Sequence, residues 1–272
     1  MQMNKFGDLS DAINRTQQRR YLVHTWKSST LAQIRAVAVY LPAAYESDPL
    51  RHFPVMYLHD GQNLFDPELS YVKGSTWRAG ETADRLTEEG KIEPLILIGV
   101  ANVGVGRIAE YTPFADHRLG GGEGPQFAQA IVDGMLPSIA SRYRVATGRD
   151  NTGIGGSSLG GLLSLWMGFH YPEIFGRVAA LSPSLWWAKR HMLTESGFLE
   201  ITQRPRIWLD MGLEEGLAHV RDTDLLARTL EHKGWQSGRD LRYRRIRHGI
   251  HSETAWADRF GEVLEFLFPA TK

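Results

Sequence analysis

A serine, an acidic cluster and a pair of histidines follow one another along the chain in an order that suits nucleophilic catalysis. Ser158 stands in a Gly-x-Ser-x-Gly pentapeptide, with Gly156 and Gly160 two positions away on either side. Random order in a chain of this composition would give such a pentapeptide about 0.17 times, so the motif alone is weak evidence. A nucleophilic serine also needs a base to take its proton and an acid to orient that base.

The residues around Ser158 favour a nucleophile elbow, the sharp turn between a strand and a helix that exposes a catalytic serine. A short β-type run at 151–156 precedes the serine, and the apolar helical run "LLSLWMGFH" follows it. The flanking glycines have a steric reason, because side chains there would collide with the neighbouring strand and helix. The alternative is a tight turn in which small residues merely allow close packing, and partner residues must decide between the two.

The candidates for the base follow the last expected strand. In hydrolases with this elbow the order along the chain is serine, then acid, then histidine. His248 and His251 lie in "HGIHSETAW", after the strand-like run "DLRYRRIRH". We expect His251, directly before the final helix, to be the base, and His248 to be a solvated loop residue. A zinc site shared by the two is disfavoured because no further ligands stand at useful spacing.

The orienting acid is expected in the turn "DMGLEEG", which offers Asp210, Glu214 and Glu215. Asp210 still belongs to the preceding strand, and Glu214 fits a solvent-facing position at a helix N-terminus. Glu215 lies beyond Gly212 in the turn, from where its carboxylate can reach the imidazole. We therefore expect Glu215 to hold the Nδ1–H tautomer of His251 and to stabilise the imidazolium, with Asp210 and Glu214 as alternatives.

Acyl transfer also needs two backbone donors for the oxyanion of the tetrahedral intermediate. One is expected from Leu159, the residue after the nucleophile, and the other from the loop "HDGQNLFD". Gly61 permits a sharp turn in that loop, which aims the N–H of Gln62 inward. The alternative is an ordinary Asp-Gly turn in which His59 and Asp60 are structural.

The elements that must position these residues form an alternating pattern of strands and helices. Short apolar runs suit parallel strands covered on both faces, and longer helical patterns separate them. The expected strands are 53–59, 94–102, 151–156, 176–182 and 206–211, and the helical patterns between them are 76–90, 126–143 and 159–175. This alternation predicts an α/β fold with a mostly parallel central sheet and helices on both faces.

The two ends of the chain complete this expected architecture. The runs at 19–26 and 33–42 have no helix between them and predict an antiparallel hairpin at one edge of the sheet. The pattern at 215–234 predicts a helix, and the final helix is expected to begin near Ser252, a suitable N-cap. Since no repeat or linker interrupts the 272 residues, we expect a single domain, 1–272, with a possible short cap around 183–205.

Composition excludes several function classes. Lys plus Arg and Asp plus Glu number 31 each, so the chain lacks the positive charge expected of a general nucleic-acid binder. The absence of cysteine excludes thiol catalysis, disulfides and thiolate metal sites. No segment is long and apolar enough to cross a bilayer, and the start lacks the apolar core of a signal peptide. We expect a cytoplasmic protein unless a signal has been removed; the sequence does not define its oligomeric state.

The segments that carry the candidate residues resemble the esterase family of α/β-hydrolases, in its enterochelin esterase-like branch, which is related to esterase D and to mycolyltransferases. The resemblance runs from "FPVMYLHDGQNLFD" to the last helix and is strongest in "GGSSLGGLLSLWMGFHYPEIFGRVAALSPSLWW". It implies an α/β-hydrolase fold and ester hydrolysis through an acyl-enzyme, with no metal and no organic cofactor. It places the triad on Ser158, Glu215 and His251 and the oxyanion loop on Asp60, Gly61 and Gln62.

The substrate is less well defined by the sequence. The section before the resemblance is short for the leading domain of enzymes that open siderophore lactones. We therefore expect a general carboxylesterase for small-molecule esters, with a siderophore-lactone, feruloyl or acetyl esterase as alternatives. From a different class, a non-catalytic binding module on a hydrolase fold is the alternative, although such a module usually lacks a member of the triad.

Aromatic and charged residues near the expected site carry two further expectations. Trp186, Trp187 and Trp77 could form an aromatic wall for an acyl or aryl group, or belong in part to the core. The segment "RIAEYTP" also resembles the family, and for it we expect only packing or an ion pair between Arg107 and Glu110.

Overall fold

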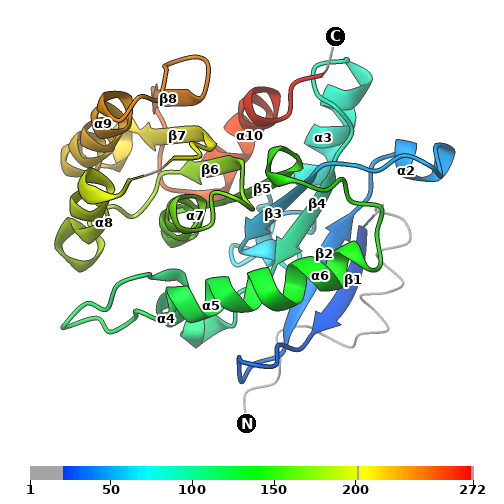
Figure 1. Ribbon diagram of the computed structural model, residues 1–272, viewed down its shortest axis with the longest axis horizontal. Coiled ribbons are helices and arrows are strands. Elements are labelled where there is room, and N and C mark those ends of the chain that lie inside the picture. Colours follow the sequence, from blue (N-terminus) through cyan, green and yellow to red (C-terminus); the bar gives the residue numbers. More distant parts are fainter. Residues whose placement is uncertain (1–20, 201, 271–272) are drawn as a thin grey trace.

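The computed structural model describes residues 21–200 and 202–270, and within them eight strands form one sheet in the order β1-β2-β4-β3-β5-β6-β7-β8 (Figure 1). β1 pairs antiparallel with β2 and β2 with β4, whereas all other neighbouring strands are parallel. The strands are β1 Tyr21–Trp26, β2 Arg35–Tyr40, β3 Val55–His59, β4 Ile96–Val100, β5 Thr152–Ser157, β6 Arg177–Leu181, β7 Arg206–Gly212 and β8 Leu241–Ile246. The expected α/β-hydrolase fold, with its antiparallel hairpin at one edge, is confirmed.

Helices connect most of the strands and lie on both faces of the sheet (Figure 1). The α-helices are α2 Ala44–Ser47, α3 Ala79–Glu88, α4 Arg107–Tyr111, α5 Gly124–Ala130, α6 Leu136–Ala140, α7 Leu159–His170, α8 Trp187–Phe198, α9 Leu217–His232 and α10 Glu253–Leu267. Short 3₁₀ turns are η1 Gly61–Asn63, η2 Gly104–Gly106, η4 Arg149–Asn151 and η5 Leu213–Glu215, and η3 Ile131–Met135 is a π-helical turn. None of the helices in the described part of the chain is long and apolar enough to span a membrane.

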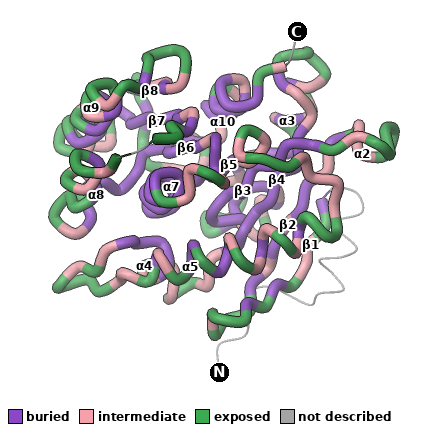
Figure 2. Tube along the Cα trace, viewed as in Figure 1, coloured by how far each residue is buried: buried purple, intermediate pink, exposed green. Residues whose placement is uncertain are grey.

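Alternate residues of the central strands enter two separate apolar layers, one on each face of the sheet. In β3, Val55 and Tyr57 join one layer, whereas Met56 and Leu58 join the other. Helices α5, α6, α7 and α9 cover the first layer, and α3 and α10 cover the second. The central strands are therefore buried on both sides, as their continuous apolar runs predict (Figure 2).

The helix expected at 126–143 is interrupted in a way that the sequence explains. Its first part, α5, passes into the π-helical turn η3 before α6 begins. Pro137 has no N–H to donate, and its ring would clash with the carbonyl of Asp133 four residues earlier in a regular helix. Widening the preceding turn to π geometry accommodates the proline without ending the helix.

The segment expected as a cap, 183–205, contains α8 and a short left-handed stretch at its start. Ala188, Lys189 and Arg190 all have positive φ, between 46° and 66°. Arg190 Nε donates to Asp222 of α9 at 2.8 Å, which ties α8 to that helix. A covering role for the segment over the site stays a prediction.

Candidate active site

Ser158 occupies the turn between β5 and α7 at the carboxyl edge of the sheet. Its φ of 56° and ψ of −121° lie in a region that residues with a side chain rarely adopt. A Cβ at Gly156 would lie 2.9 Å from the carbonyl carbon of Gly160, and a Cβ at Gly160 would lie 3.0 Å from the Cβ of His59. The two glycines are thus required by the close approach of strand, helix and neighbouring strand, as expected for a nucleophile elbow.

The structure brings Ser158, His251 and Glu215 into one hydrogen-bonded chain. His251 Nε2 lies 3.0 Å from Ser158 Oγ, and His251 Nδ1 lies 2.6 Å from Glu215 Oε2. Glu215 lies in η5, after β7, and His251 lies in the loop between β8 and α10. Because β7 and β8 are parallel neighbours, both loops leave the sheet at the edge that carries Ser158. This is the arrangement of a serine nucleophile, a base and an orienting acid.

Glu215 is nearly enclosed, with a side-chain exposure of 3%. Its Oε1 accepts hydrogen bonds from Ser182 Oγ at 2.6 Å and from the Gly212 N–H at 3.1 Å. Burial by itself raises the pKa of Glu215, but the hydrogen bonds from His251 and Ser182 outweigh it and hold that pKa below its ordinary value. The carboxylate is therefore ionised at neutral pH and able to orient the imidazole.

The two alternative acids have other partners. Asp210 is fully buried in β7 and accepts from Arg259 Nε and Nη2, each at 3.0 Å. Glu214 Oε1 lies 3.0 Å from His248 Nδ1, and the His248 side chain is 77% exposed, in keeping with a solvated loop residue. Neither carboxylate reaches His251, so Glu215 is the acid that the geometry supports.

The loop expected to hold the oxyanion folds differently from the sequence analysis in one respect. The left-handed residue is Asp60, with a φ of 58°, and not Gly61. Gly61 is needed for space instead, since a Cβ there would lie 2.3 Å from the carbonyl carbon of Gly99 in β4. The loop therefore lies directly on β4 and places Gln62 in η1, while Leu159 is the first residue of α7, where the N–H has no intrahelical acceptor.

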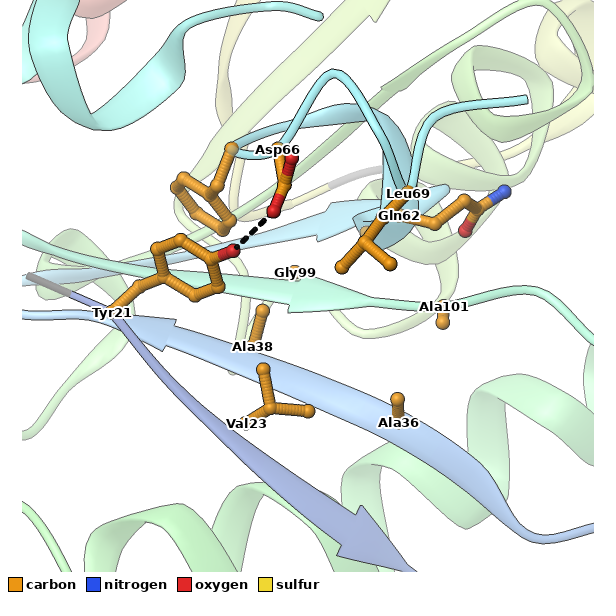
Figure 3. Close-up of a pocket in the computed structure, with 11 residues that line it drawn as sticks. Tyr21, Val23, Ala36, Ala38, Gln62, Asp66, Leu69, Gly99 and Ala101 are labelled. Carbon is orange, nitrogen blue, oxygen red and sulfur yellow. Dashed lines mark hydrogen bonds between the residues drawn. The ribbon is translucent and has the colours of Figure 1, made fainter. Parts of the chain in front are cut away.

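A small pocket beside this loop shows how the sheet makes room for it (Figure 3). The strand residues beneath are small, which lets the loop approach the sheet. Tyr21 Oη donates to Asp66 Oδ2 at 3.3 Å across the pocket. The small residues are Ala36 and Ala38 of β2, Gly99 of β4, and Ala101 directly after β4.

The Asp60 carboxylate anchors the same loop from the other side. Arg107 donates to it from Nε at 2.8 Å and from Nη2 at 2.7 Å, and Asn102 Nδ2 donates at 2.7 Å. The expected ion pair between Arg107 and Glu110 is wrong. Glu110 is buried beside β2 and instead accepts two hydrogen bonds from Arg35, which is buried as well. Arg107 is therefore paired with Asp60 and not with Glu110.

Two of the three tryptophans considered for an aromatic wall are buried in the core. Trp77 and Trp187 are each 2% exposed, and their indole N–H groups donate to Glu253 and to the Phe114 carbonyl. A buried indole needs such an acceptor, which places both rings in the core. Trp186, after β6, is 43% exposed and is the one of the three that is left to meet a substrate.

Two serines that contact the triad were missed by the sequence analysis. Ser184 Oγ lies 3.2 Å from Ser158 Oγ, and Ser182 Oγ donates to Glu215. Both belong to "SPSLWW", the end of the stretch in which the resemblance to the esterase family is strongest. No spacing rule predicts that these hydroxyls contact the triad, since they lie in the segment after the neighbouring strand β6.

The sequence also did not reveal that two ionisable groups beside the site are buried. Glu253, the first residue of α10, accepts from Asn63 Nδ2 at 3.0 Å and from Trp77, and burial raises its pKa to about 7. His59 is fully buried, and neither of its ring nitrogens has a hydrogen-bond partner among residues 21–200 and 202–270. Burial lowers the pKa of His59 to about 4, so the imidazole is neutral near neutral pH.

Comparison with known proteins gives consistent results. A family model described as "Putative esterase" matches residues 28–267. The uncharacterized protein YbbA of Bacillus subtilis is 26% identical over 248 residues, which cover 86% of this chain and 92% of YbbA. The iron(III) enterobactin esterase of Dickeya dadantii is 38% identical over 69 residues, which cover 25% of this chain and 16% of that protein.

Among solved structures, the BES protein of Bacillus cereus superposes with a TM-score of 0.73 at 18% identity, covering 92% of this chain and 95% of that one. The enterobactin esterase of Shigella flexneri gives a TM-score of 0.71 at 20% identity over 91% of this chain. This chain spans 59% of the Shigella protein. At 18% to 20% identity, these superpositions show that this chain has the same fold as the two proteins and show no more than that.

Proposed function

The chain belongs to the esterase family, whose members hydrolyse ester bonds, and on this premise we propose that it is a serine carboxylesterase with a triad of Ser158, His251 and Glu215. The observation that carries the proposal is the continuous chain of contacts from Glu215 Oε2 through both ring nitrogens of His251 to Ser158 Oγ. The 3.0 Å contact is short enough for the proton transfer from Ser158 to His251, and the 2.6 Å contact lets the Glu215 carboxylate orient the imidazole and stabilise the imidazolium.

In the proposed acylation step, Ser158 Oγ attacks the ester carbonyl carbon while His251 Nε2 takes its proton. Glu215 stabilises the imidazolium that forms, and the N–H groups of Gln62 and Leu159 hold the oxyanion. The tetrahedral intermediate collapses by breaking the bond to the alkoxide, which receives the proton from His251 and leaves as an alcohol. The acyl group is then bonded to Ser158.

Water completes the cycle by the same chemistry. His251 removes a proton from a water molecule as its oxygen attacks the acyl carbon, and Ser158 Oγ leaves with that proton. The carboxylic acid is released and the triad is restored. An alcohol in place of water would give acyl transfer, and product analysis separates the two.

For the substrate, the exposed apolar side chains at the catalytic edge of the sheet are the best guide. The segments after β4, β6, β7 and β8 start at the edge of the sheet where Ser158 lies, and each carries solvent-facing apolar residues with exposures of 42% to 96%. They are Val105, Ile108, Trp186, Leu213, Leu217 and Ile250. Since exposed apolar side chains on segments that start at this edge can contact an apolar group of a substrate, we propose esters with an apolar acyl or aryl group.

Aryl esters form a second candidate within this class. Trp186 offers an exposed indole in the loop after β6, and relatives include proteins named as a feruloyl esterase and as enterobactin esterases. This supports an aromatic acid as one possible acyl group. A non-catalytic binding module is disfavoured by the complete set of triad contacts.

The proposal is tested by hydrolysis of p-nitrophenyl butyrate by the wild type and by Ser158→Ala, with circular dichroism as a check of folding. We expect the variant to lose at least about 10³-fold in rate. A panel of p-nitrophenyl acetate, butyrate and octanoate, together with methyl ferulate, then ranks alkyl against aryl acyl groups. Equal rates for the two proteins, or no hydrolysis of any ester in the panel, would contradict the proposal.

A further inference from the structure

The tripeptide Ser182-Pro183-Ser184, after β6, contacts both ends of the triad. Ser182 Oγ donates to Glu215 Oε1 at 2.6 Å, and Ser184 Oγ lies 3.2 Å from Ser158 Oγ. The backbone supports the second contact, because the Ser184 N–H donates to the carbonyl of Ser158 at 3.0 Å. Both serines are buried, so water competes little for their hydroxyl groups.

The direction of the hydrogen bond at Ser182 follows from its other partners. Trp256 Nε1 lies 3.1 Å and Arg259 Nη2 lies 2.8 Å from Ser182 Oγ, and both groups can only donate. A hydroxyl has two lone pairs and one hydrogen, so the lone pairs are occupied and the hydrogen is directed to Glu215. Arg259 is itself fixed by its ion pair with buried Asp210.

The ionised state of Glu215 determines which atom is the donor in each remaining hydrogen bond of the triad. Because the ionised Glu215 has no hydrogen of its own, His251 Nδ1 must donate to it, and the neutral imidazole then has a bare Nε2. The Ser158 hydroxyl gives its one hydrogen to that nitrogen. At the contact between Ser158 and Ser184, the donor is therefore Ser184.

From these contacts we infer that Ser182 and Ser184 are positioning residues for the triad. Ser182, held by Arg259 and Trp256, keeps Glu215 ionised and aimed at His251. Ser184 donates to the oxygen of Ser158 and holds it in line with His251 Nε2. The inference rests on the proposed function, because it concerns how the proposed triad is kept ready to react.

The two serines are expected to affect different parts of the reaction. The oxygen of free Ser158 is a good hydrogen-bond acceptor and gains negative charge as its proton leaves, so the Ser184 hydroxyl stabilises acylation. In the acyl-enzyme this oxygen belongs to an ester and is a weaker acceptor, so Ser184 contributes less to deacylation. Ser182 acts through Glu215, and its effect is therefore on the pH dependence set by the His251–Glu215 pair.

For Ser184 the test is Ser184→Ala, with Ser196→Ala as matched control. Ser196 is an equally buried serine of α8, bonded to the Leu193 carbonyl. The first readout is the second-order rate of labelling by a fluorophosphonate, which reports the reactivity of Ser158. We expect Ser184→Ala to lower this rate, and kcat/KM for p-nitrophenyl butyrate, by about 10-fold, the effect of one hydrogen bond. Ser184→Thr, which keeps the hydroxyl, should recover most of the rate.

For Ser182 the readout is the pH profile of kcat/KM. In Ser182→Ala, Glu215 Oε1 loses the hydrogen bond from the Ser182 hydroxyl. More of the negative charge of the carboxylate is then on Oε2, which faces His251, so the imidazolium of His251 is more stable. We expect the acid limb to move to higher pH by about half a unit. A purely structural role would lower the rate at all pH values without moving the limb.

The outcomes separate this inference from the proposed function. If the wild type hydrolyses esters and Ser158→Ala does not, the proposed function stands. The inference is then overturned if Ser184→Ala is labelled as fast as the wild type, or if Ser196→Ala is slowed as much. An acid limb that stays in place in Ser182→Ala would overturn the role of Ser182. An inactive wild type would contradict the proposed function itself.

Discussion

At the scale of single residues, burial and partners distinguish acids that look alike in the sequence. The adjacent residues Glu214 and Glu215 each lie beside one histidine, at 3.0 Å and 2.6 Å. Glu214 and its partner His248 are exposed, whereas Glu215 is enclosed and accepts two further hydrogen bonds. Water reaches both partners of the first pair but only His251 in the second, where the Glu215 carboxylate is enclosed, so solvent screens the second pair less.

The first residue-scale prediction compares these two neighbours. Glu215→Gln removes the charge that stabilises the imidazolium of His251, and we expect kcat/KM for p-nitrophenyl butyrate to fall by on the order of 10³-fold or more. Glu214→Gln, changed in the same way one position earlier, should stay within about twofold of the wild type. Steady-state kinetics at pH 8 decides, and a larger loss in Glu214→Gln would move the triad acid to Glu214.

The second prediction concerns the base. His251→Ala removes the group that takes the proton from Ser158 and should abolish nearly all turnover, while circular dichroism shows an unchanged fold. His248→Ala serves as control, because its side chain is mostly in solvent and does not contact the serine. If His251→Ala were active and His248→Ala were not, the assignment of the base would be wrong.

At the scale of elements, the loop at Asp60–Asn63, which we propose holds the oxyanion, is fixed by several parts of the fold at once. Asp60 is bonded to Arg107 at the start of α4, Gly61 lies on β4, and Asn63 is bonded to Glu253 at the start of α10. A residue with a side chain at positive φ, such as Asp60, is unfavourable by itself and must be supported by its surroundings. These contacts hold Asp60 in this conformation and fix the loop that carries Gln62.

The prediction at this scale is that Arg107→Gln lowers kcat more than it raises KM. The substitution leaves the buried Asp60 carboxylate with Asn102 as its remaining side-chain donor, so the loop is less well fixed when the oxyanion forms. We expect a loss in kcat of at least about 10-fold. Arg78→Gln is the control, since its ion pair with Glu81 is exposed. An unchanged kcat in Arg107→Gln would contradict an anchoring role.

Elements were predicted from the sequence more successfully than the contacts between them. The strands β3 to β7, the edge strand β8 and the N-cap at Ser252 follow from local patterns, and the Ser252 side chain does accept from the Ala255 N–H. The elbow glycines were also explained correctly, because their requirement is local.

Contacts between residues far apart in the sequence could not be predicted from local patterns. The partner of Arg107 was predicted to be Glu110, three residues away, whereas it is Asp60, 47 residues away in another loop. For Trp77 and Trp187 the sequence leaves an aromatic wall and a core position open, and the burial of both rings, with acceptors for their N–H groups, places both in the core. Gly61 is required by a neighbouring strand, Gly99 of β4, which the turn itself does not reveal.

At the scale of the whole molecule, two buried ionisable groups give stability opposite dependences on pH. The pKa of His59 is lowered to about 4, so between pH 6.5 and 4 the unfolded chain binds a proton that the folded protein does not. Stability from this source falls as the pH falls. The pKa of Glu253 is raised to about 7, so between pH 4.5 and 7 the folded protein binds the extra proton, and stability falls as the pH rises. Between pH 4.5 and 6.5 the two effects oppose each other.

This opposition leads to a prediction for His59→Leu. The pKa of each group differs by about 2.5 from its ordinary value, which changes the free energy of unfolding by on the order of 3 kcal/mol at most. Leucine is similar in size to histidine, and it fills the site beside Tyr111 and Phe127 without a ring nitrogen that lacks a partner. Relative to the wild type, the variant should therefore become progressively more stable as the pH falls from 6.5 to 4, whereas near pH 7.5 the difference between the two should no longer depend on pH.

Urea unfolding between pH 4.5 and 7.5 measures this difference, and the exposed His52→Gln serves as the control that removes a histidine without changing the interior. Since the rise from His59 is gone in His59→Leu, the stability of that variant between pH 4.5 and 7 should increase less, or fall more, than that of the wild type. A constant difference between variant and wild type across this range would mean that His59 binds its proton equally in both states, and that burial of the neutral imidazole does not control the acid stability of the fold.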